Sequence, residues 1–340
     1  MSFLTFNREI QLGDKVLCYM GPESMCILTM SQEGSLQNRF GEFKHQDMIG
    51  QKWGTKMPSK TGRGFIYLLQ PSPELWTLCL PHRTQILYMP DISFVSTFLQ
   101  LKPGVKMIES GTGSGSFSHS IARSIAPSGH LFTFEYHEER AAKATKEFAD
   151  HQLEHLVTVE CRDVCKDGFG IQNRVTAVFL DLPAPWEAIA SAKAAFKSNR
   201  IGRLCSFSPC IEQVQQTCKA LAEHGFNDIR MMEVLIRPHE VHSVVASLLP
   251  DMRPVSVGVK RKEMDDPDEP SASKLDESKS SLDENSEPKL LGDDGAKKSE
   301  RNSKDALVSR ITKEVRGHTS YLTFATLYPS ADSVSSSEPQ

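Results

Sequence analysis

The chain has 340 residues, of which 39% are hydrophobic and 24% charged, and it carries a formal net charge of −4. No apolar run approaches the roughly 20 residues of a membrane-spanning helix, and the first residues lack a signal-peptide core. The eight cysteines form no C-x-x-C pair, which disfavours a disulfide framework and leads us to expect no metal site. We therefore expect reduced, mostly structural thiols, as in the cytosol or the nucleus. The expected location is the nucleus, with the cytoplasm as a possible second location.

The acidic charge is concentrated in one segment. Residues Lys260–Asp305 hold 10 basic and 14 acidic side chains, so the remainder of the chain is electrically balanced. Any affinity for RNA must then come from local basic patches or from another subunit.

Residues 1–72 are predicted to form a small β domain, a barrel or a sandwich. Strand-like runs separated by Gly and Pro turns cover Lys15–Met20, Met25–Met30, Gln37–Lys44 and Gly64–Gln70. Between them lies the segment Lys52–Arg63, a loop with four cations. It is either an ordinary solvated loop or one that contacts phosphate, and the pattern leaves both open.

Residues 73–242 alternate between helical and strand-like patterns. Helices are predicted over 74–80 and 91–101, followed by strand 105–109, helix 116–126, strand 130–135, helix 137–151, strands 156–160 and 175–181, helix 186–196, strand 201–207, helix 210–224 and strand 226–235. This alternation is typical of a parallel sheet with helices on both faces.

The pattern breaks at residues 243–316, which are rich in Ser, Glu, Asp and Lys and are expected to be a largely disordered insert. Residues 317–328 then form a closing strand, so that the insert extends the tip of a hairpin, and residues 329–340 are expected to be a disordered tail.

The centre of the chain is a glycine-rich turn. A short apolar run ends at Glu109 and is followed by Gly111, Gly113 and Gly115, directly before a helical pattern. Glycines between a strand and a helix let backbone N–H groups approach a ligand closely, although a glycine-rich connection without a ligand is the alternative. Serines stand where a dinucleotide fingerprint needs its last glycine. The spacing resembles the first motif of Rossmann-like methyltransferases that bind S-adenosylmethionine.

Three further acids follow the next predicted strands. Glu135 comes about 20 residues after the glycines, where an acid can bind ribose hydroxyls. Asp163 could accept from an adenine amino group, and Asp181 is held by two prolines that follow it. Each could instead be a solvated carboxylate or a helix cap, but strand ends of one sheet meet at a shared site. Trp186 is left unassigned between core packing and base stacking.

Five motifs carry a closer resemblance. The segments PELWTLCLPHRTQILY, ESGTGSGS, FEYHEER, DLPAPW and CSFSPCIEQVQ resemble the catalytic subunits of tRNA adenine N1-methyltransferases, which modify adenosine 58 of the T-loop. The resemblance covers residues 1–240 and 317–327. It implies an α/β fold, with a Rossmann-like seven-stranded methyltransferase domain and a small N-terminal β-barrel domain. It also implies a tRNA substrate and an assembly of two catalytic with two non-catalytic, RNA-binding subunits, because the acidic insert looks eukaryotic.

The resemblance also carries residue roles. Ser114 to Ser116 and Leu87 would contact the methionine part of the cofactor, Glu135 its ribose, and Asp163 with Val164 its adenine. The complete set of implied cofactor contacts is Leu87, Glu109, Gly111, Gly113, Ser114, Gly115, Ser116, Glu135, Arg140, Asp163, Val164 and Asp181. The implied RNA contacts are Arg83, Thr84, Gln85, Tyr88, Leu182, Pro183, Ser206, Ser208, Pro209, His318 and Thr319.

The expected activity is N1-methylation of adenosine 58, with Asp181 as the catalytic residue that aims the adenine and stabilises its new positive charge. The main alternative is a non-catalytic RNA-binding paralogue with the same fold, which has no need for both the glycines and Asp181. A methyltransferase for small molecules or proteins is disfavoured by the separate N-terminal domain and its basic loop. A nicotinamide enzyme is disfavoured by the glycine spacing.

Overall fold

The structure is a computed structural model that describes residues 7–21, 24–81, 83–236, 239–246, 304–311 and 320–329. The chain divides into two compact units, one formed by Met1–Ile236 with Arg316–Gln340 and the other by Arg237–Val315. The predicted sites His318 and Thr319, most of the predicted insert and nearly all of the predicted tail lie outside the described residues.

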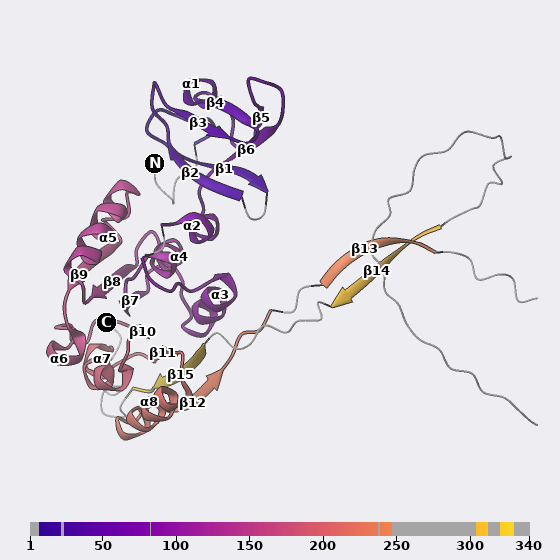
Figure 1. Cartoon of the computed structure of the whole chain (residues 1–340). Coiled ribbons are helices and arrows are strands. Elements are labelled where there is room, and N and C mark those ends of the chain that lie inside the picture. The colour runs from indigo at the N-terminus through magenta and orange to yellow at the C-terminus, as the bar shows by residue number, and fades with distance from the viewer. Residues whose placement is uncertain are drawn as a thin grey trace, which may run out of the picture. The chain divides into compact units, whose positions relative to one another are not determined.

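The N-terminal region forms a small β domain (Figure 1). Its described strands build an antiparallel sheet in the order β2 (Ser24–Thr29), β1 (Lys15–Gly21), β6 (Phe65–Leu69) and β5 (Lys56–Pro58), and a separate hairpin of β3 (Ser35–Asn38) and β4 (Gly41–Lys44), followed by helix α1 (His45–Met48). Val16, Phe43 and Ile66 are fully buried in one core that both sheets share. The predicted β domain is therefore present, as two ladders that do not close into one continuous barrel within the described residues.

Two predictions in this region are wrong in detail. The single strand predicted over Gln37–Lys44 is split, because the Phe40 N–H bonds to Oδ1 of Asn38 at 2.8 Å and Gly41 has a φ of +122°. Such an Asx-type turn with a glycine reverses the chain. The basic segment Lys52–Arg63 is not wholly a loop, since its middle forms β5, which pairs with β6.

The large sheet contains seven strands among the described residues. Their order is β12 (Asn227–Met232), β15 (Tyr321–Leu327), β11 (Gly202–Ser208), β10 (Ala177–Asp181), β7 (Lys106–Ser110), β8 (His130–Glu135) and β9 (Val157–Cys161). All pairs are parallel except those of β15, which runs antiparallel to both of its neighbours. The predicted seven-stranded Rossmann-like sheet and its closing strand are confirmed, and the sheet is mixed because of that strand.

Helices cover both faces of this sheet (Figure 1). They are α2 (Pro73–Cys79), α3 (Met89–Phe98), α4 (Ser116–Ile125), α5 (Glu138–Asp150), α6 (Val164–Asp167), the 3₁₀ helix η1 (Pro185–Ala188), α7 (Ile189–Ala195) and α8 (Ile211–Glu223). Successive strand residues alternate between two apolar layers: Met107 packs with α3, α4 and α5, and Ile108 packs with α7 and α8. Because helices cover both faces of the sheet, its strands carry apolar residues on both faces.

The second unit contributes one antiparallel ladder. Strand β13 (His239–Ala246) pairs with β14 (Lys304–Ile311) over the register from His239 with Ile311 to Ala246 with Lys304. The predicted disordered insert 243–316 therefore contains paired strands at its described ends. Among the described helices, none is both long and apolar enough to cross a membrane.

Candidate active site

A cavity of about 820 Å³ opens at the carboxyl ends of the large sheet's strands. It lies where the strand order reverses, because β7 has β8 on one side and β10 on the other. Crevices of this kind are the usual ligand sites of open parallel sheets. The lining residues are Thr84, Gln85, Ser110, Gly111, Gly113, Phe134, Glu135, Tyr136, His137, Arg140, Arg162, Asp163, Val164, Cys165, Asp181, Leu182, Pro183, Ala184, Phe207, Pro209 and Gln213.

The glycine-rich loop forms one wall of the cavity. Gly111, Gly113 and Gly115 have φ angles of +92°, +55° and +76°, all in the region that favours glycine. The N–H groups of Gly111 and Thr112 both donate to the carbonyl of Phe134, at 2.9 and 3.2 Å. Gly115 is the N-cap of α4. The loop therefore joins β7 to a helix start, as predicted, and is attached to the end of β8.

Glu135 is the most completely bonded acid of the site. Its Oε1 accepts from Arg140 Nη2 at 2.7 Å, from Arg140 Nε at 3.0 Å and from the His137 N–H at 3.1 Å. Its Oε2 accepts from the Gly113 N–H at 3.0 Å. Since a carboxylate offers about four acceptor positions, Oε2 keeps the capacity to accept from a hydroxyl group. The carboxylate is thus held rigidly on the cavity wall, which suits a ribose.

Asp163 serves as a helix cap that also lines the cavity. Its Oδ1 accepts from the Cys165 and Lys166 N–H groups at 3.2 and 3.4 Å, and Lys166 Nζ lies 3.2 Å from Oδ2. These bonds start α6, a short helix that the pattern did not predict. The alternative of a helix cap therefore holds for Asp163, and its neighbour Val164 also lines the cavity.

Asp181 is the last residue of β10 and lies in the wall of the cavity. Burial, together with the nearby Glu135 carboxylate, raises the pKa of Asp181 to about 6. No described residue caps η1 with a side chain, and the N-cap of that helix is Ala184. The helix-cap alternative for Asp181 is therefore wrong, and the residue lines the cavity, where a ligand can meet its carboxylate.

Glu109 lies behind the glycine-rich loop. Only 2% of the residue is exposed, and its Oε2 accepts from Ser118 Oγ at 2.6 Å and Thr133 Oγ1 at 2.7 Å. Burial raises the pKa of Glu109 to about 7. With Leu87, Ser114 and Ser116 it lines a small hollow of about 30 Å³, which adjoins the large cavity and shares lining residues such as Gly111 and Asp181 with it. Its two hydrogen bonds join the end of β7 to α4 and to β8, and its predicted contact with the cofactor stays a prediction.

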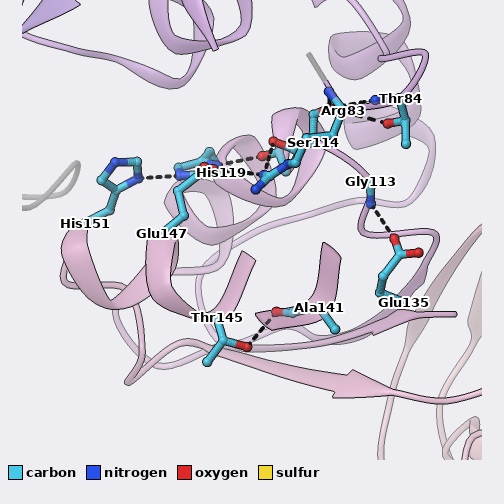
Figure 2. A network of polar contacts seen from close by, with 11 residues as sticks. Arg83, Thr84, Gly113, Ser114, His119, Glu135, Ala141, Thr145, Glu147 and His151 are labelled. Atoms are coloured by element: carbon cyan, nitrogen blue, oxygen red, sulfur yellow. Dashed lines mark hydrogen bonds and ion pairs between the residues drawn. The ribbon is translucent and has the colours of Figure 1, made fainter. Parts of the chain in front are cut away.

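A polar network that the sequence did not predict surrounds the loop (Figure 2). His119 Nδ1 lies 2.6 Å from the Gly115 carbonyl, and its Nε2 lies 2.7 Å from His151 Nδ1. Burial lowers the pKa of His119 to about 4 and that of His151 to about 2, so both rings are neutral. Because a carbonyl only accepts, Nδ1 of His119 carries the proton and Nε2 accepts from His151. The possible metal-ligand atoms of His119, Glu147 and His151 all lie within 4.8 Å of one another. The hydrogen bonds of the two histidines explain why their rings lie so close together.

The predicted RNA contacts among the described residues fall into two groups. Thr84, Gln85, Leu182, Pro183 and Pro209 line the cavity. The others that are described lie elsewhere: Tyr88 is 46% exposed outside the cavity lining, the side chain of Arg83 is 14% exposed and bonded inward, and Ser206 and Ser208 are fully buried in β11. Both serines would have to become accessible to touch RNA, and their RNA contact stays a prediction.

Sequence reasoning missed several residues of the cavity wall. Tyr136, His137 and Arg162 adjoin the predicted acids in sequence, and that adjacency was an available signal. Gln213 adjoins no predicted acid, although it stands in the motif CSFSPCIEQVQ. Its Nε2 donates to the Pro183 carbonyl at 2.9 Å and its Oε1 accepts from the Cys210 N–H at 3.2 Å. It thereby ties the loop after β10 to the loop after β11.

Comparison with known proteins adds independent information. The family model described as "tRNA methyltransferase complex GCD14 subunit" matches residues 64–327. A catalytic subunit of tRNA (adenine(58)-N(1))-methyltransferase from Dictyostelium discoideum is 43% identical over 96% of this chain and 99% of its own length. The subunit of the same name from Candida albicans is 40% identical over 97% of this chain and 99% of its own.

Solved structures show the same fold. A SAM-dependent O-methyltransferase from Thermotoga maritima is 26% identical, with a TM-score of 0.67 and coverage of 94% of both chains. A tRNA (m1A58) methyltransferase from Aquifex aeolicus is 20% identical, with a TM-score of 0.62 over 94% of this chain and 98% of its own. The family model matches most of the chain, and the relatives are similar to it over nearly their whole length. The chain therefore belongs to the tRNA methyltransferase complex GCD14 subunit family.

Proposed function

We propose that this chain transfers a methyl group from S-adenosylmethionine to N1 of adenosine 58 in tRNA. The observation that carries the proposal is the placement of Asp181 and Glu135 in the wall of one cavity, beside the glycine-rich loop. The curated relatives, at 43% and 40% identity over nearly the whole chain, are catalytic subunits named for this reaction.

The cavity residues fit the cofactor. Oε2 of Glu135 keeps an acceptor position for a ribose hydroxyl, and Asp163 and Val164 line the same cavity and would frame the adenine. Gly111 and Gly113 let the backbone approach the ligand without a Cβ. When bound, S-adenosylmethionine supplies an electrophilic methyl group attached to a positively charged sulfur.

Asp181 would act on the target base. Adenine N1 has a lone pair, so no base needs to remove a proton before the attack. Transfer of the methyl group from sulfur to N1 would leave the positive charge of the sulfonium on the adenine ring. An ionised carboxylate that accepts from the exocyclic amino group both aims N1 and stabilises that charge.

The target adenosine must leave its stack to reach Asp181, as base-modifying enzymes require. Leu182, Pro183 and Pro209 line the cavity on the side of Asp181 and would surround the extruded base. Gln213 would keep the loops of Pro183 and Pro209 in register, through its bonds to the Pro183 carbonyl and the Cys210 N–H.

We further propose that a non-catalytic, RNA-binding subunit completes the enzyme, in an assembly of two copies of each subunit located in the nucleus. Outside the acidic segment Lys260–Asp305 the chain has no net charge, and tRNA binding depends strongly on cationic side chains. The description of the family as part of a complex is consistent with such a partner.

The test is incubation of the chain, co-purified with its partner, with unmodified tRNA transcript and methyl-labelled S-adenosylmethionine. Mass analysis of the nuclease digest should find 1-methyladenosine in the fragment that contains position 58. A transcript with guanosine at that position is the control and should stay unlabelled. Tight tRNA binding without any label transfer would favour the non-catalytic paralogue instead.

A further inference from the structure

The side chain of Arg83 lies inside the protein, between the glycine-rich loop and helix α5 (Figure 2). Its Nη2 donates to the Ser114 carbonyl at 3.0 Å and lies 3.3 Å from Oε2 of Glu147. Both side chains of the ion pair are only 14% exposed. The guanidinium is therefore a link between the loop and the helix, and it is largely withdrawn from solvent.

Ser114 is bonded by two consecutive residues of the segment before α3. Its Oγ accepts from the Arg83 N–H at 2.8 Å and lies 3.2 Å from the Thr84 nitrogen, which also donates. Its carbonyl accepts from the Arg83 side chain. Both the side chain and the main chain of Ser114 are thus fixed by the same segment.

The opposite side of the loop is bonded to the predicted ribose ligand. The Gly113 N–H donates to Glu135 Oε2, and Gly113 immediately precedes Ser114. Rotation of the peptides around Ser114 would therefore also turn the N–H that Glu135 accepts. The bonds of Arg83 to Ser114 and to Glu147 set the orientation of these peptides.

We propose that Arg83 and Glu147 are positioning residues that hold the glycine-rich loop in the conformation that binds the cofactor. This inference rests on the proposed function, because it takes that loop as the S-adenosylmethionine site. It replaces the RNA contact that the resemblance implied for Arg83. A phosphate contact would use a guanidinium that faces solvent, whereas Arg83 is bonded to Ser114 and Glu147.

Because the ion pair of Arg83 and Glu147 is buried, single and double variants should affect cofactor affinity differently. Removing one member leaves an uncompensated charge in a place with little solvent, and removing both does not. Arg83→Met, Glu147→Met and the double variant should therefore be strongly non-additive. The double variant should lose less cofactor affinity than the sum of the two single losses.

The experiment measures the Kd of S-adenosylmethionine by calorimetry, the kcat, and the Kd of tRNA at several salt concentrations, all with the complete complex. Arg83→Met should weaken cofactor binding about tenfold or more, as loss of a charge-assisted hydrogen bond predicts. Arg83→Lys, which keeps the charge with a shorter reach, should recover part of that loss. The tRNA Kd and its dependence on salt should stay at the wild-type values.

The pair of Arg123 and Glu74 provides a matched control. Arg123 Nη1 donates to Glu74 Oε2 at 2.9 Å, but the side chains are 42% and 36% exposed and do not line the cavity. Arg123→Met should leave cofactor affinity unchanged, because exposed pairs contribute little. It therefore separates loss of an ion pair in general from loss of the loop's support.

The opposite result would overturn the inference. Arg83 is an RNA contact if Arg83→Met keeps the wild-type cofactor Kd but lowers the slope of log affinity for tRNA against log salt by about one phosphate contact. Should Arg83→Met fail to fold, Arg83→Lys and Glu147→Gln are measured in its place, and unchanged cofactor affinity in both rejects the positioning role. A wild-type complex that does not bind S-adenosylmethionine would reject the proposed function itself.

Discussion

Gly111 lies directly against the backbone of Asp181. A Cβ atom built on Gly111 would overlap the Asp181 carbonyl oxygen and would lie 3.2 Å from the Asp181 Cβ. The first glycine of the loop after β7 and the last residue of β10 are thus in contact only because glycine has no side chain. A shift of the glycine-rich loop at Gly111 would therefore also move the backbone of Asp181, the proposed catalytic acid.

Gly111→Ala should therefore impair both cofactor binding and methyl transfer, since the new methyl group must displace the Asp181 backbone. Gly50→Ala is the control, because Gly50 has a φ of +84° and no heavy atom within 4 Å of a built Cβ. In Gly50→Ala the new side chain meets no neighbour, so the only cost is that of an alanine in a left-handed backbone conformation, about 1–2 kcal/mol. Calorimetry and initial rates should show a loss for Gly111→Ala alone, and equal behaviour of the two variants would refute the contact.

Glu135→Gln should raise the Kd of S-adenosylmethionine about tenfold to a hundredfold. The amide would turn an N–H₂ group toward Arg140 or the Gly113 N–H, which are both donors. Glu138→Gln changes an exposed acid in the first turn of α5 and should bind like wild type. Calorimetry with S-adenosylmethionine alone measures these Kd values. An unaltered Kd for Glu135→Gln would show that Glu135 does not bind the cofactor.

Glu109→Gln should change how stability depends on pH. The pKa of Glu109 is raised from its ordinary 4.5 to about 7, mainly by burial, so the folded state favours the protonated acid. Its contribution is present below pH 4.5 and is lost as the pH rises through about 7. Relative to wild type, Glu109→Gln should gain unfolding free energy between pH 5 and pH 8, by denaturant titration. The exposed Glu223→Gln should show no such trend.

The strand and helix pattern of the large domain was predictable because local periodicity encodes it. The glycines, Glu135 and Asp181 follow strands that are apolar on both faces, and parallel strands bring their ends together. Helix α6 is four residues long and is started by the bonds of Asp163, and so short an element leaves no periodic signal.

The supports of the loop were not predictable from the sequence. Arg83 and Glu147 are 64 residues apart, and His119 and His151 are 32 apart. His119 and His151 meet because α4 and α5 both pack against β8. Arg83 reaches Glu147 from a segment that is bonded to Ser114. A single sequence does not show which charged residues become buried. The RNA contact expected for Arg83 came from the family resemblance, and the sequence alone does not show that its guanidinium bonds to Ser114 and Glu147.

The activity should fall as the pH drops through about 6, because burial and Glu135 raise the pKa of Asp181 to that value and only the ionised carboxylate stabilises the new charge. Asp181→Asn cannot ionise, so its single-turnover rate should lack this acidic limb. Rates between pH 5 and pH 8 would test this. An unchanged limb in Asp181→Asn would assign the titration to another group.

The most direct measurement is the single-turnover rate of methyl transfer in Asp181→Ala, with saturating cofactor and tRNA. The rate should fall about a hundredfold or more, as loss of one oriented electrostatic group predicts, while the Kd of S-adenosylmethionine changes little. Asp181→Asn should fall between alanine and wild type, because an amide oxygen can still accept from the adenine amino group. A wild-type rate in Asp181→Ala would contradict the role of Asp181 and the mechanism built on it.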